Sequence, residues 1–369
     1  MPTFTNGDTQ WHWALAALLF FIPPAGAQHK TFIGAEGCHA CHPAVFARQS
    51  ASGHARSLSR TTEHPLASRF ATALPLERPP GFRLQLLNGG GQWRLRADDG
   101  RYGSEAPVEW AFGAGDQAVT FLGKVTGDYY LELSLSYFSD TASLDLTPRH
   151  DLLPSRTLNE AMGQPIATRT AGVTCFGCHS TGPVTVSPGG EIRITERGVR
   201  CEVCHGPGSA HRAAALGGKI GVARKLIDKP GGALNDFCGR CHRVTGNLQQ
   251  IDWQSPWSVR HQPPYLARSR CFQESGGKLS CLTCHDPHDP LRRQDAAYYR
   301  ARCVSCHGAG DHAPKQICLV EQPPDCARCH MPAVPAGPHL RFVNHWIGIY
   351  DGPSAMPVRL DRSLPPAPR

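Results

Sequence analysis

One five-residue pattern, Cys-x-x-Cys-His, occurs seven times in this chain and constrains its fold more than any other feature. Every Cys-x-x-Cys among the 369 residues is followed immediately by histidine, so 14 of the 16 cysteines belong to the pattern. Residues three or four positions apart share one face of a helical turn. The two thiols and the histidine of each motif are therefore expected to face the same side. Numbered in chain order, motifs 1 to 7 are Cys38–His42, Cys175–His179, Cys201–His205, Cys238–His242, Cys281–His285, Cys303–His307 and Cys326–His330.

This arrangement predicts a covalently attached c-type haem at each of the seven motifs. The paired thiols reach the two vinyl groups of one porphyrin, and the histidine binds the iron as its proximal ligand. The predicted thioether residues are Cys38, Cys41, Cys175, Cys178, Cys201, Cys204, Cys238, Cys241, Cys281, Cys284, Cys303, Cys306, Cys326 and Cys329. The predicted proximal ligands are His42, His179, His205, His242, His285, His307 and His330.

Cysteine pairs also build zinc sites and disulfide frameworks. Neither use requires a histidine after every pair, so haem attachment is the preferred interpretation. Cys271 and Cys318 stand outside the motifs. In an oxidising compartment they are expected to form a disulfide, with two free thiols as the alternative.

The N-terminus has the features of an export signal. An apolar run from Trp13 to Ile22 is followed by two prolines and then by Ala25-Gly-Ala27, a small-x-small cleavage pattern. The run is too short to span a bilayer core of about 30 Å. No Lys or Arg precedes it, and a short buried helix is the alternative. We expect residues 1–27 to be a signal peptide cleaved near Ala27, and the mature protein to be periplasmic.

The spacing of the motifs divides the chain. The first cysteines of motifs 1 and 2 are 137 residues apart, whereas those of motifs 2 to 7 follow at intervals of 22 to 43 residues. We expect a first haem segment at 28–80, a haem-free β-rich segment at 81–150, a six-haem region at 151–346 and a Pro-rich, disordered tail at 347–369. Attached haems separated by so little polypeptide must lie close together.

The haem-free segment shows the alternation typical of strands. Phe82, Leu84 and Leu86 precede a glycine-rich turn at 88–91, and a second hairpin pattern turns at 127–128. These patterns predict a small antiparallel sheet over about 81–140. With 38 Gly, 32 Pro and only 8% aromatic residues, the chain has a thin apolar core. The expected fold is that of a multihaem cytochrome c, with short α-helices and extensive coil around packed haems and a small antiparallel β-rich segment (α+β overall, with little regular secondary structure).

Each haem iron takes a sixth ligand or keeps an open position. Eleven of the 19 histidines lie outside both the motifs and residues 1–27, so counting alone neither proves nor excludes an open iron. His288 follows His285 by three residues with Pro287 between them, so it is expected to face a different haem. The stronger candidates for distal ligands are His54, His150, His211, His261, His288 and His345. The weaker candidates are His39, His64, His312 and His339, and Met162, Met331 and Met356 are less favoured than imidazoles.

The net charge of +8 is spread along the sequence without a basic run, so nucleic-acid binding is not expected. A bis-imidazole ferric haem contributes about −1, because two propionates outweigh the charge of the iron–porphyrin core. The basic residues are therefore expected to neutralise haem propionates.

Four parts of the chain carry a resemblance to known proteins, namely Cys38–His42 with Ser52-Gly-His-Ala55, Gly198–Gly208 with His211, Leu279–His288 and Cys326–Pro332. They resemble multihaem cytochromes related to the tetrahaem cytochrome c of ammonia oxidisers, the electron acceptor of hydroxylamine oxidoreductase. The resemblance covers most of the mature chain and implies bis-histidine haems in stacked pairs, an electron-transfer role, and His54, His211 and His288 as distal ligands. Relatives often carry a histidine near Gly113-Ala-Gly115, where this chain has Asp116 and Gln117.

The function expected from the sequence is electron transfer by an exported heptahaem c-type cytochrome, without catalytic residues. Its expected partners are redox proteins or membrane quinol-oxidising or reductase complexes, with membrane association only through those partners. The alternative is a multihaem oxidoreductase acting on a small nitrogen or sulfur species at one open haem iron. A third possibility, a conduit or polymerising component, differs from the carrier only in its partners.

Overall fold

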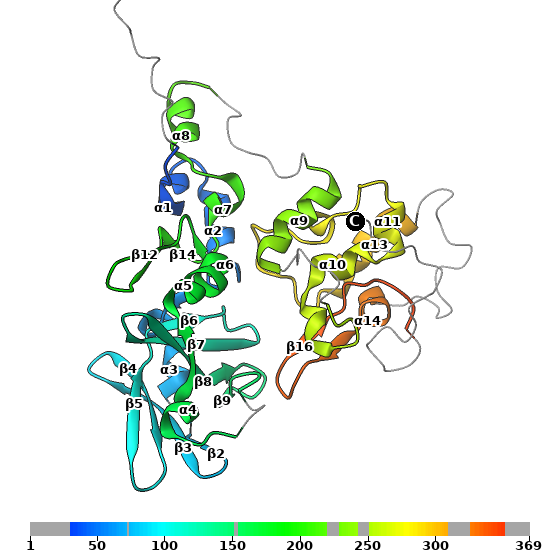
Figure 1. The fold of residues 1–369 in the computed structure, drawn as a ribbon. Helices are drawn as coiled ribbons and strands as arrows, with labels where there is room; N and C mark the ends of the chain where they lie inside the picture. The colour runs from blue at the N-terminus through cyan, green and yellow to red at the C-terminus, as the bar shows by residue number, and fades with distance from the viewer. Residues whose placement is uncertain are drawn as a thin grey trace, which may run out of the picture.

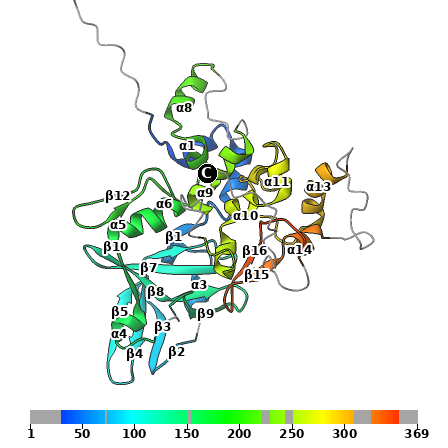
Figure 2. The same cartoon turned by 45° about the vertical axis from the view of Figure 1, so that its right-hand side comes forward.

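A computed structural model describes residues 30–71, 74–150, 154–219, 229–242, 251–308 and 325–350. Figure 1 shows them as two lobes side by side, and Figure 2 shows the same arrangement from a second direction. The N-terminal lobe comprises the described residues of 30–219, and the C-terminal lobe those of 229–350. The predicted signal peptide, the tail beyond residue 350, His312, Cys318 and Met356 lie outside the described residues.

Two antiparallel sheets build one half of the N-terminal lobe (Figure 1). One has four strands in the order β2–β3–β4–β5, and the other has six, in the order β1–β6–β7–β8–β10 with β9 paired to β8. The strands are β1 (Leu58–Arg60), β2 (Leu76–Arg78), β3 (Phe82–Gly89), β4 (Gln92–Asp98), β5 (Gly103–Pro107), β6 (Trp110–Phe112), β7 (Ala118–Thr126), β8 (Tyr129–Phe138), β9 (Ser143–Leu146) and β10 (Gly163–Ala167).

Both predicted hairpins are confirmed. Leu86 of β3 lies opposite Leu95 of β4, and the turn is made by Gly90 and Gly91 with φ of 60° and 77°. Glycine adopts positive φ at both central turn positions without a steric penalty. β7 and β8 turn at residues 127–128, with Thr126 opposite Tyr129.

The structure differs from the sequence-based expectation of a single sheet over residues 81–140. Two sheets form, and their strands run from residue 58 to residue 167. Each hairpin buries the alternate side chains of one face, and the two faces cover each other in a shared core. That core contains Leu84 and Leu95 from one sheet and Phe121 and Leu133 from the other, all 0% exposed.

The opposite face of the six-stranded sheet anchors motif 2. Phe176, which lies between the two cysteines of that motif, packs edge-to-face on Trp110 and on Phe112, with ring centres 5.1 Å apart in each pair. These three rings belong to a second core cluster that also contains Leu122 and Ile192. Motif 2 is thus fixed to the sheet by one of its own residues.

Short helices and two-residue strands complete the N-terminal lobe, with much coil between them. The helices are α1 (Gly34–His39), α2 (Pro43–Ser50), η1 (Thr61–Glu63), α3 (Ala67–Ala71), α4 (Leu158–Met162), α5 (Thr168–Ala171), η2 (Gly172–Phe176), α6 (Gly177–His179), α7 (Cys201–His205) and α8 (Ser209–Leu216). The strand pairs are β11 (Ser180–Thr181) with β14 (Glu196–Arg197), and β12 (Thr185–Val186) with β13 (Ile192–Arg193).

The C-terminal lobe has little apolar core. One small cluster contains Ile251, Val259, Tyr265, Val334 and Trp346. Helices α11 to α14 contain no buried residue. The elements of the lobe are α9 (Gly231–His242), η4 (Pro256–Arg260), α10 (Gln262–Ala267), α11 (Arg270–Glu274), α12 (Cys281–Cys284), α13 (Ala296–His307), α14 (Cys326–His330), β15 (Ala333–Pro335) and β16 (Arg341–Val343).

In the described parts of the chain, no helix combines the length and the apolar character needed to cross a membrane.

A histidine between β15 and β16 joins the C-terminal lobe to the sheets. The His339 ring stacks on Phe138, with Nδ1 3.1 Å from an oxygen of Asp140 and Nε2 2.8 Å from an oxygen of Asp145. Burial opposes charging of the imidazole, but the hydrogen bonds to Asp145 and Asp140 outweigh it and raise the pKa of His339 above its usual value. An imidazolium is the form that donates from both nitrogens.

We expect this contact to weaken as the pH rises. The pKa of His339 is higher in the folded protein than the unfolded value of about 6.5, so its contribution to stability is fully present below about pH 6.5. That contribution is lost as the pH rises through the raised, folded-state pKa. The His339→Gln variant should lose this part of the pH dependence of unfolding, measured by denaturant titration on both sides of the transition. Identical pH profiles for parent and variant would contradict the assignment.

Candidate functional site

Each motif lies on a helical turn or closes one, as predicted. The backbone N–H of His42 donates to the carbonyl of Cys38 at 3.0 Å, and that of His285 donates to the carbonyl of Cys281 at 3.0 Å. Motifs 3 and 7 are the short helices α7 and α14, and motifs 4 and 6 end the longer helices α9 and α13. The thiols and the histidine of each motif are thereby held close to one another.

Four motif histidines each face a histidine from outside the motifs. The two rings of each pair are held at nearly the same separation, although their relative tilt varies from pair to pair. The ring-centre distances are 6.2 Å for His42 and His211, 6.0 Å for His54 and His242, 6.0 Å for His205 and His288, and 6.3 Å for His285 and His345.

This separation matches two axial ligands of one metal ion. A metal–imidazole bond is about 2 Å long, and the ring centre lies about 1 Å behind the bonding nitrogen, so ligands on opposite sides of one ion have ring centres about 6 Å apart. Beside the His285–His345 pair, helices α12 and α13 contain no buried residue. The residues present therefore fit a large apolar group with an axially ligated metal, which is what a c-type haem is.

Hydrogen bonds to backbone and carboxylate oxygens orient several motif histidines and several of the histidines that face them. A ring whose Nδ1 is engaged in this way presents Nε2 to a metal. The Nδ1 contacts are His179 with the Ser57 carbonyl at 3.0 Å, His330 with the Gly348 carbonyl at 2.8 Å, His345 with the Val343 carbonyl at 2.9 Å and His288 with Asp286 at 3.0 Å.

Burial favours the neutral imidazole in four of the eight paired rings, those of His54, His242, His285 and His345. It lowers the pKa of His54, His242 and His285 below the usual histidine range. Burial also lowers the pKa of His345 to about 4. Metal binding requires the neutral form of imidazole, so these side chains are ready to bind without first losing a proton.

The thiols of different motifs lie in contact with one another. Hydrogen-bonding contacts join Cys38 with Cys201, Cys178 with Cys241, Cys238 with Cys281, and Cys303 with Cys326. Burial raises the pKa of Cys38 to about 12. No disulfide joins any two of the described cysteines, and Cys318, the predicted partner of Cys271, lies outside the described residues.

The remaining histidine candidates have other surroundings. His150 is 4% exposed, and its Nε2 lies 3.3 Å from a carboxylate oxygen of Glu132. His39 stacks on Phe46, and Nε2 of His64 lies 3.1 Å from the Gly113 carbonyl. Within the described residues, the rings of His39, His64, His150 and His339 contact groups other than a motif histidine.

His261 and the two described methionine candidates lie elsewhere. His261 separates η4 from α10, next to Gln262, whose side chain hydrogen-bonds to His242. Met162 is buried in the core between the sheets, and Met331 follows α14. In the part of the chain that the structure describes, the motif histidines His179, His307 and His330 have no facing imidazole of the kind found in the four pairs.

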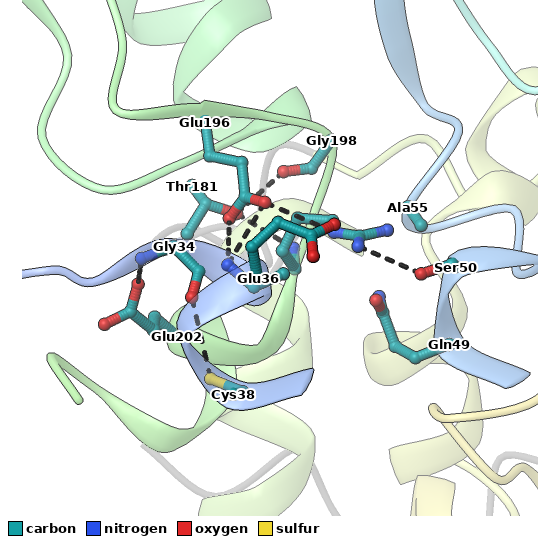
Figure 3. Close-up of polar contacts among 12 residues, drawn as sticks. Gly34, Glu36, Cys38, Gln49, Ser50, Ala55, Thr181, Glu196, Gly198 and Glu202 are labelled. Atoms are coloured by element: carbon teal, nitrogen blue, oxygen red, sulfur yellow. Dashed lines mark hydrogen bonds and ion pairs between the residues drawn. The ribbon is translucent and has the colours of Figure 1, made fainter. Parts of the chain in front are cut away.

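Glu202 positions motif 1 relative to motif 3, a role that the sequence alone did not reveal. Glu202 lies inside motif 3 and is 3% exposed. Its carboxylate accepts hydrogen bonds from the backbone N–H groups of Ile33, Gly34 and Gly208 at 2.7–3.2 Å. Figure 3 shows this carboxylate at the start of α1, with Glu196 beside it. The signal in the sequence was a carboxylate between the two cysteines of a motif.

Glu202→Gln is expected to lower the free energy of unfolding by about 1–3 kcal/mol, because hydrogen bonds to a charged acceptor are replaced by bonds to a neutral amide. Glu36→Gln is the matched control, since the Glu36 side chain is 81% exposed on the neighbouring helix α1. Denaturant unfolding of the mature protein measures both. Equal effects of the two substitutions would contradict the assigned role.

The described residues contain no cluster of three or more His, Cys, Asp or Glu side chains arranged to hold a metal ion. Four of the seven motif histidines are instead arranged in the two-ring pairs described above.

Comparison with known proteins gives one structural likeness. No protein-family model and no curated protein matches the chain. The chain is similar to a solved structure described as "Crystal Structure of Outer Cell Wall Cytochrome OcwA", with a TM-score of 0.49 and 17% identity over 86% of this chain and 79% of the other.

Proposed function

We propose that this chain is an exported multihaem c-type cytochrome that carries electrons between redox proteins. One observation carries the proposal: four motif histidines each face another histidine at the separation of two axial ligands, with ring centres 6.0–6.3 Å apart. A haem bound there supplies a one-electron couple between ferric and ferrous iron. The protein's part is to hold two imidazoles in place in both states, so that no ligand is exchanged when an electron arrives.

The contacts between motif thiols support transfer among neighbouring sites rather than isolated cofactors. They join motifs 1 and 3, 2 and 4, 4 and 5, and 6 and 7. Each cysteine would be linked to the porphyrin of its own motif, so thiols in contact bring two attachment sites together. A carrier needs such adjacency, because electrons must pass from one site to the next.

The finer parts of the proposal come from the sequence. They are seven haems, a periplasmic location after cleavage near Ala27, and redox proteins or membrane quinol-oxidising or reductase complexes as partners. The narrower resemblance to the tetrahaem cytochrome of ammonia oxidisers stays a prediction. Its implied distal ligands His54, His211 and His288 are all members of the four pairs.

The alternative function, an oxidoreductase for a small nitrogen or sulfur species, concerns motifs 2, 6 and 7. Within the described residues their histidines, His179, His307 and His330, have no facing imidazole. An iron with an open position is high-spin and binds added ligands, whereas a bis-histidine iron is low-spin.

Mass spectrometry and EPR of the mature protein test the proposal. We expect the added mass of seven haems, and low-spin ferric signals from at least the four paired sites. A colourless or zinc-loaded protein would overturn the proposal. High-spin signals that respond to cyanide, together with reduction of a small substrate, would favour the enzyme instead.

A further inference from the structure

The four histidine pairs differ in which lobes they connect. His42 and His211 both belong to the N-terminal lobe, and His285 and His345 both belong to the C-terminal lobe. The other two pairs cross from one lobe to the other. His54 of the N-terminal lobe faces His242, the last residue of α9, and His288 of the C-terminal lobe faces His205, the last residue of α7.

The two crossing pairs are reciprocal and adjacent. Each lobe contributes one motif histidine and one histidine from outside the motifs. The ring of His54 hydrogen-bonds to the carbonyl of Pro287, the residue directly before His288. Asp289, which directly follows His288, forms an ion pair of 3.1 Å with Arg48 of α2. The contact between Cys178 and Cys241 also joins the lobes, and the Cys178 thiol lies 3.8 Å from the carbonyl of Arg240. The region between the lobes around His54, His205, His242 and His288 is called the seam below.

Three further contacts join the lobes through ion pairs or hydrogen bonds. Arg293 lies 3.7 Å from Asp116, and the backbone N–H of Arg341 donates to Gln117 at 3.2 Å. The third is made by His339, whose ring stacks on Phe138 and contacts Asp140 and Asp145. Ion pairs that remain in contact with water contribute little each. Each of the three apolar clusters lies within a single lobe, two in the N-terminal lobe and one in the C-terminal lobe.

We propose that His54 and His288 are ligands exchanged between the lobes, so that the metals held at His242 and His205 join the two lobes together. This inference rests on the proposed function and adds to it an assembly role for two of the four paired sites. Docking of the lobes then depends on these two ligands, whereas His211 and His345 ligate within their own lobes and leave docking unaffected.

Two double variants with equal numbers of lost ligands test this role. H54A/H288A removes both crossing ligands, and H211A/H345A removes both ligands that stay within a lobe. EPR should show two sites turning high-spin in each variant. Small-angle X-ray scattering should show a larger radius of gyration for H54A/H288A and the parent value for H211A/H345A. Equal scattering from the two variants would overturn the proposal.

Added imidazole separates ligation from linkage. Imidazole bound to the H54A/H288A variant should restore the low-spin signals without restoring the parent radius of gyration. Free imidazole ligates the iron but does not connect the two lobes. H54M/H288M should restore the compact form through a tethered thioether ligand, with changed redox potentials. Compaction by free imidazole alone would overturn the proposal.

The single variants H54A and H288A test the same proposal if the double variant is not obtained as a haem-loaded protein. Each should show one new high-spin site. Hydrogen exchange should become faster on the opposite lobe's side of the seam, at residues 286–289 in H54A and at residues 201–206 in H288A. Unchanged exchange there would count against the linkage. If the parent itself carries no haem, the proposed function fails. If the parent is low-spin and H54A/H288A stays low-spin, only the assignment of the crossing ligands fails.

Discussion

Produced without haem attachment, the chain is expected to keep its two β-sheets folded while the C-terminal lobe loses its structure. Phe70, Leu84, Leu95, Phe121 and Tyr137 are all 0% exposed in the core between the sheets. Burying each such side chain contributes about 1.5–3 kcal/mol. The sheets therefore have a core that needs no cofactor.

The C-terminal lobe has no comparable core. Among its described hydrophobic side chains, Val259 and Tyr265 are the two at 0% exposure. Three of its four motif helices, α12, α13 and α14, contain no buried residue, whereas the fourth, α9, buries Leu234 and Asn235. The free energy that folds this lobe must then come largely from attached haems and their ligands, as it does in small domains organised by a structural metal.

Hydrogen exchange measured by mass spectrometry checks this expectation on a chain whose 14 motif cysteines are replaced by alanine. Protection should persist in β3, β4, β7 and β8 and be lost from α9 to α13. The haem-loaded parent is the control and should be protected in both regions. Protected helices in the haem-free chain would show that polypeptide alone forms their core. Unprotected sheets would show that the sheets depend on the haems.

The sequence predicted what is local in this molecule. Helical turns at the motifs depend on residues three or four positions apart, and the hairpin of β3 and β4 depends on alternation and on glycines able to adopt positive φ. The number of sheets was not predictable in the same way. It depends on how two buried faces, formed by separate hairpins, cover each other.

The partners of the distal histidines were also beyond local reasoning. His54 follows motif 1 in the sequence but faces His242 of motif 4, and His211 follows motif 3 but faces His42 of motif 1. The sequence identified both histidines as candidate distal ligands. Which motif each one faces is decided by packing between segments far apart in the chain.

Two polar features gained a role only from the structure. His150 was one of the stronger candidates for a distal ligand, yet its ring lies against Glu132 in the sheet region. Asp116 and Gln117 stand where relatives of the resembled family often carry a histidine, and here they contact Arg293 and the backbone of Arg341. Ion pairs between distant segments leave no periodic signal in a single sequence.

Arg78→Ala is expected to lower the free energy of unfolding of the sheets by about 3 kcal/mol or more, because each hydrogen bond from a charged donor contributes about 1.5–3 kcal/mol. Arg78 is 6% exposed in β2. Its guanidinium donates to Ser134 at 2.7 Å, to the carbonyl of His150 at 2.6 Å and to the carbonyl of Ala161 at 3.3 Å. It thus ties the edge of one sheet to the other sheet and to α4, and its loss leaves buried acceptors without a donor.

Arg78→Met is the matched control, since it keeps most of the aliphatic volume and removes the donors. If the lost hydrogen bonds dominate, Met should destabilise nearly as much as Ala; if the lost packing dominates, Met should be close to the parent. For Arg78→Ala, the midpoint of denaturant unfolding, followed by far-UV circular dichroism, should shift to lower denaturant concentration. The haem count and the low-spin EPR signals should stay those of the parent. Loss of those signals in Arg78→Ala under native conditions would mean that the sheets and the haem-bearing segments fold as one unit, contrary to the separate cores on which the haem-free prediction depends.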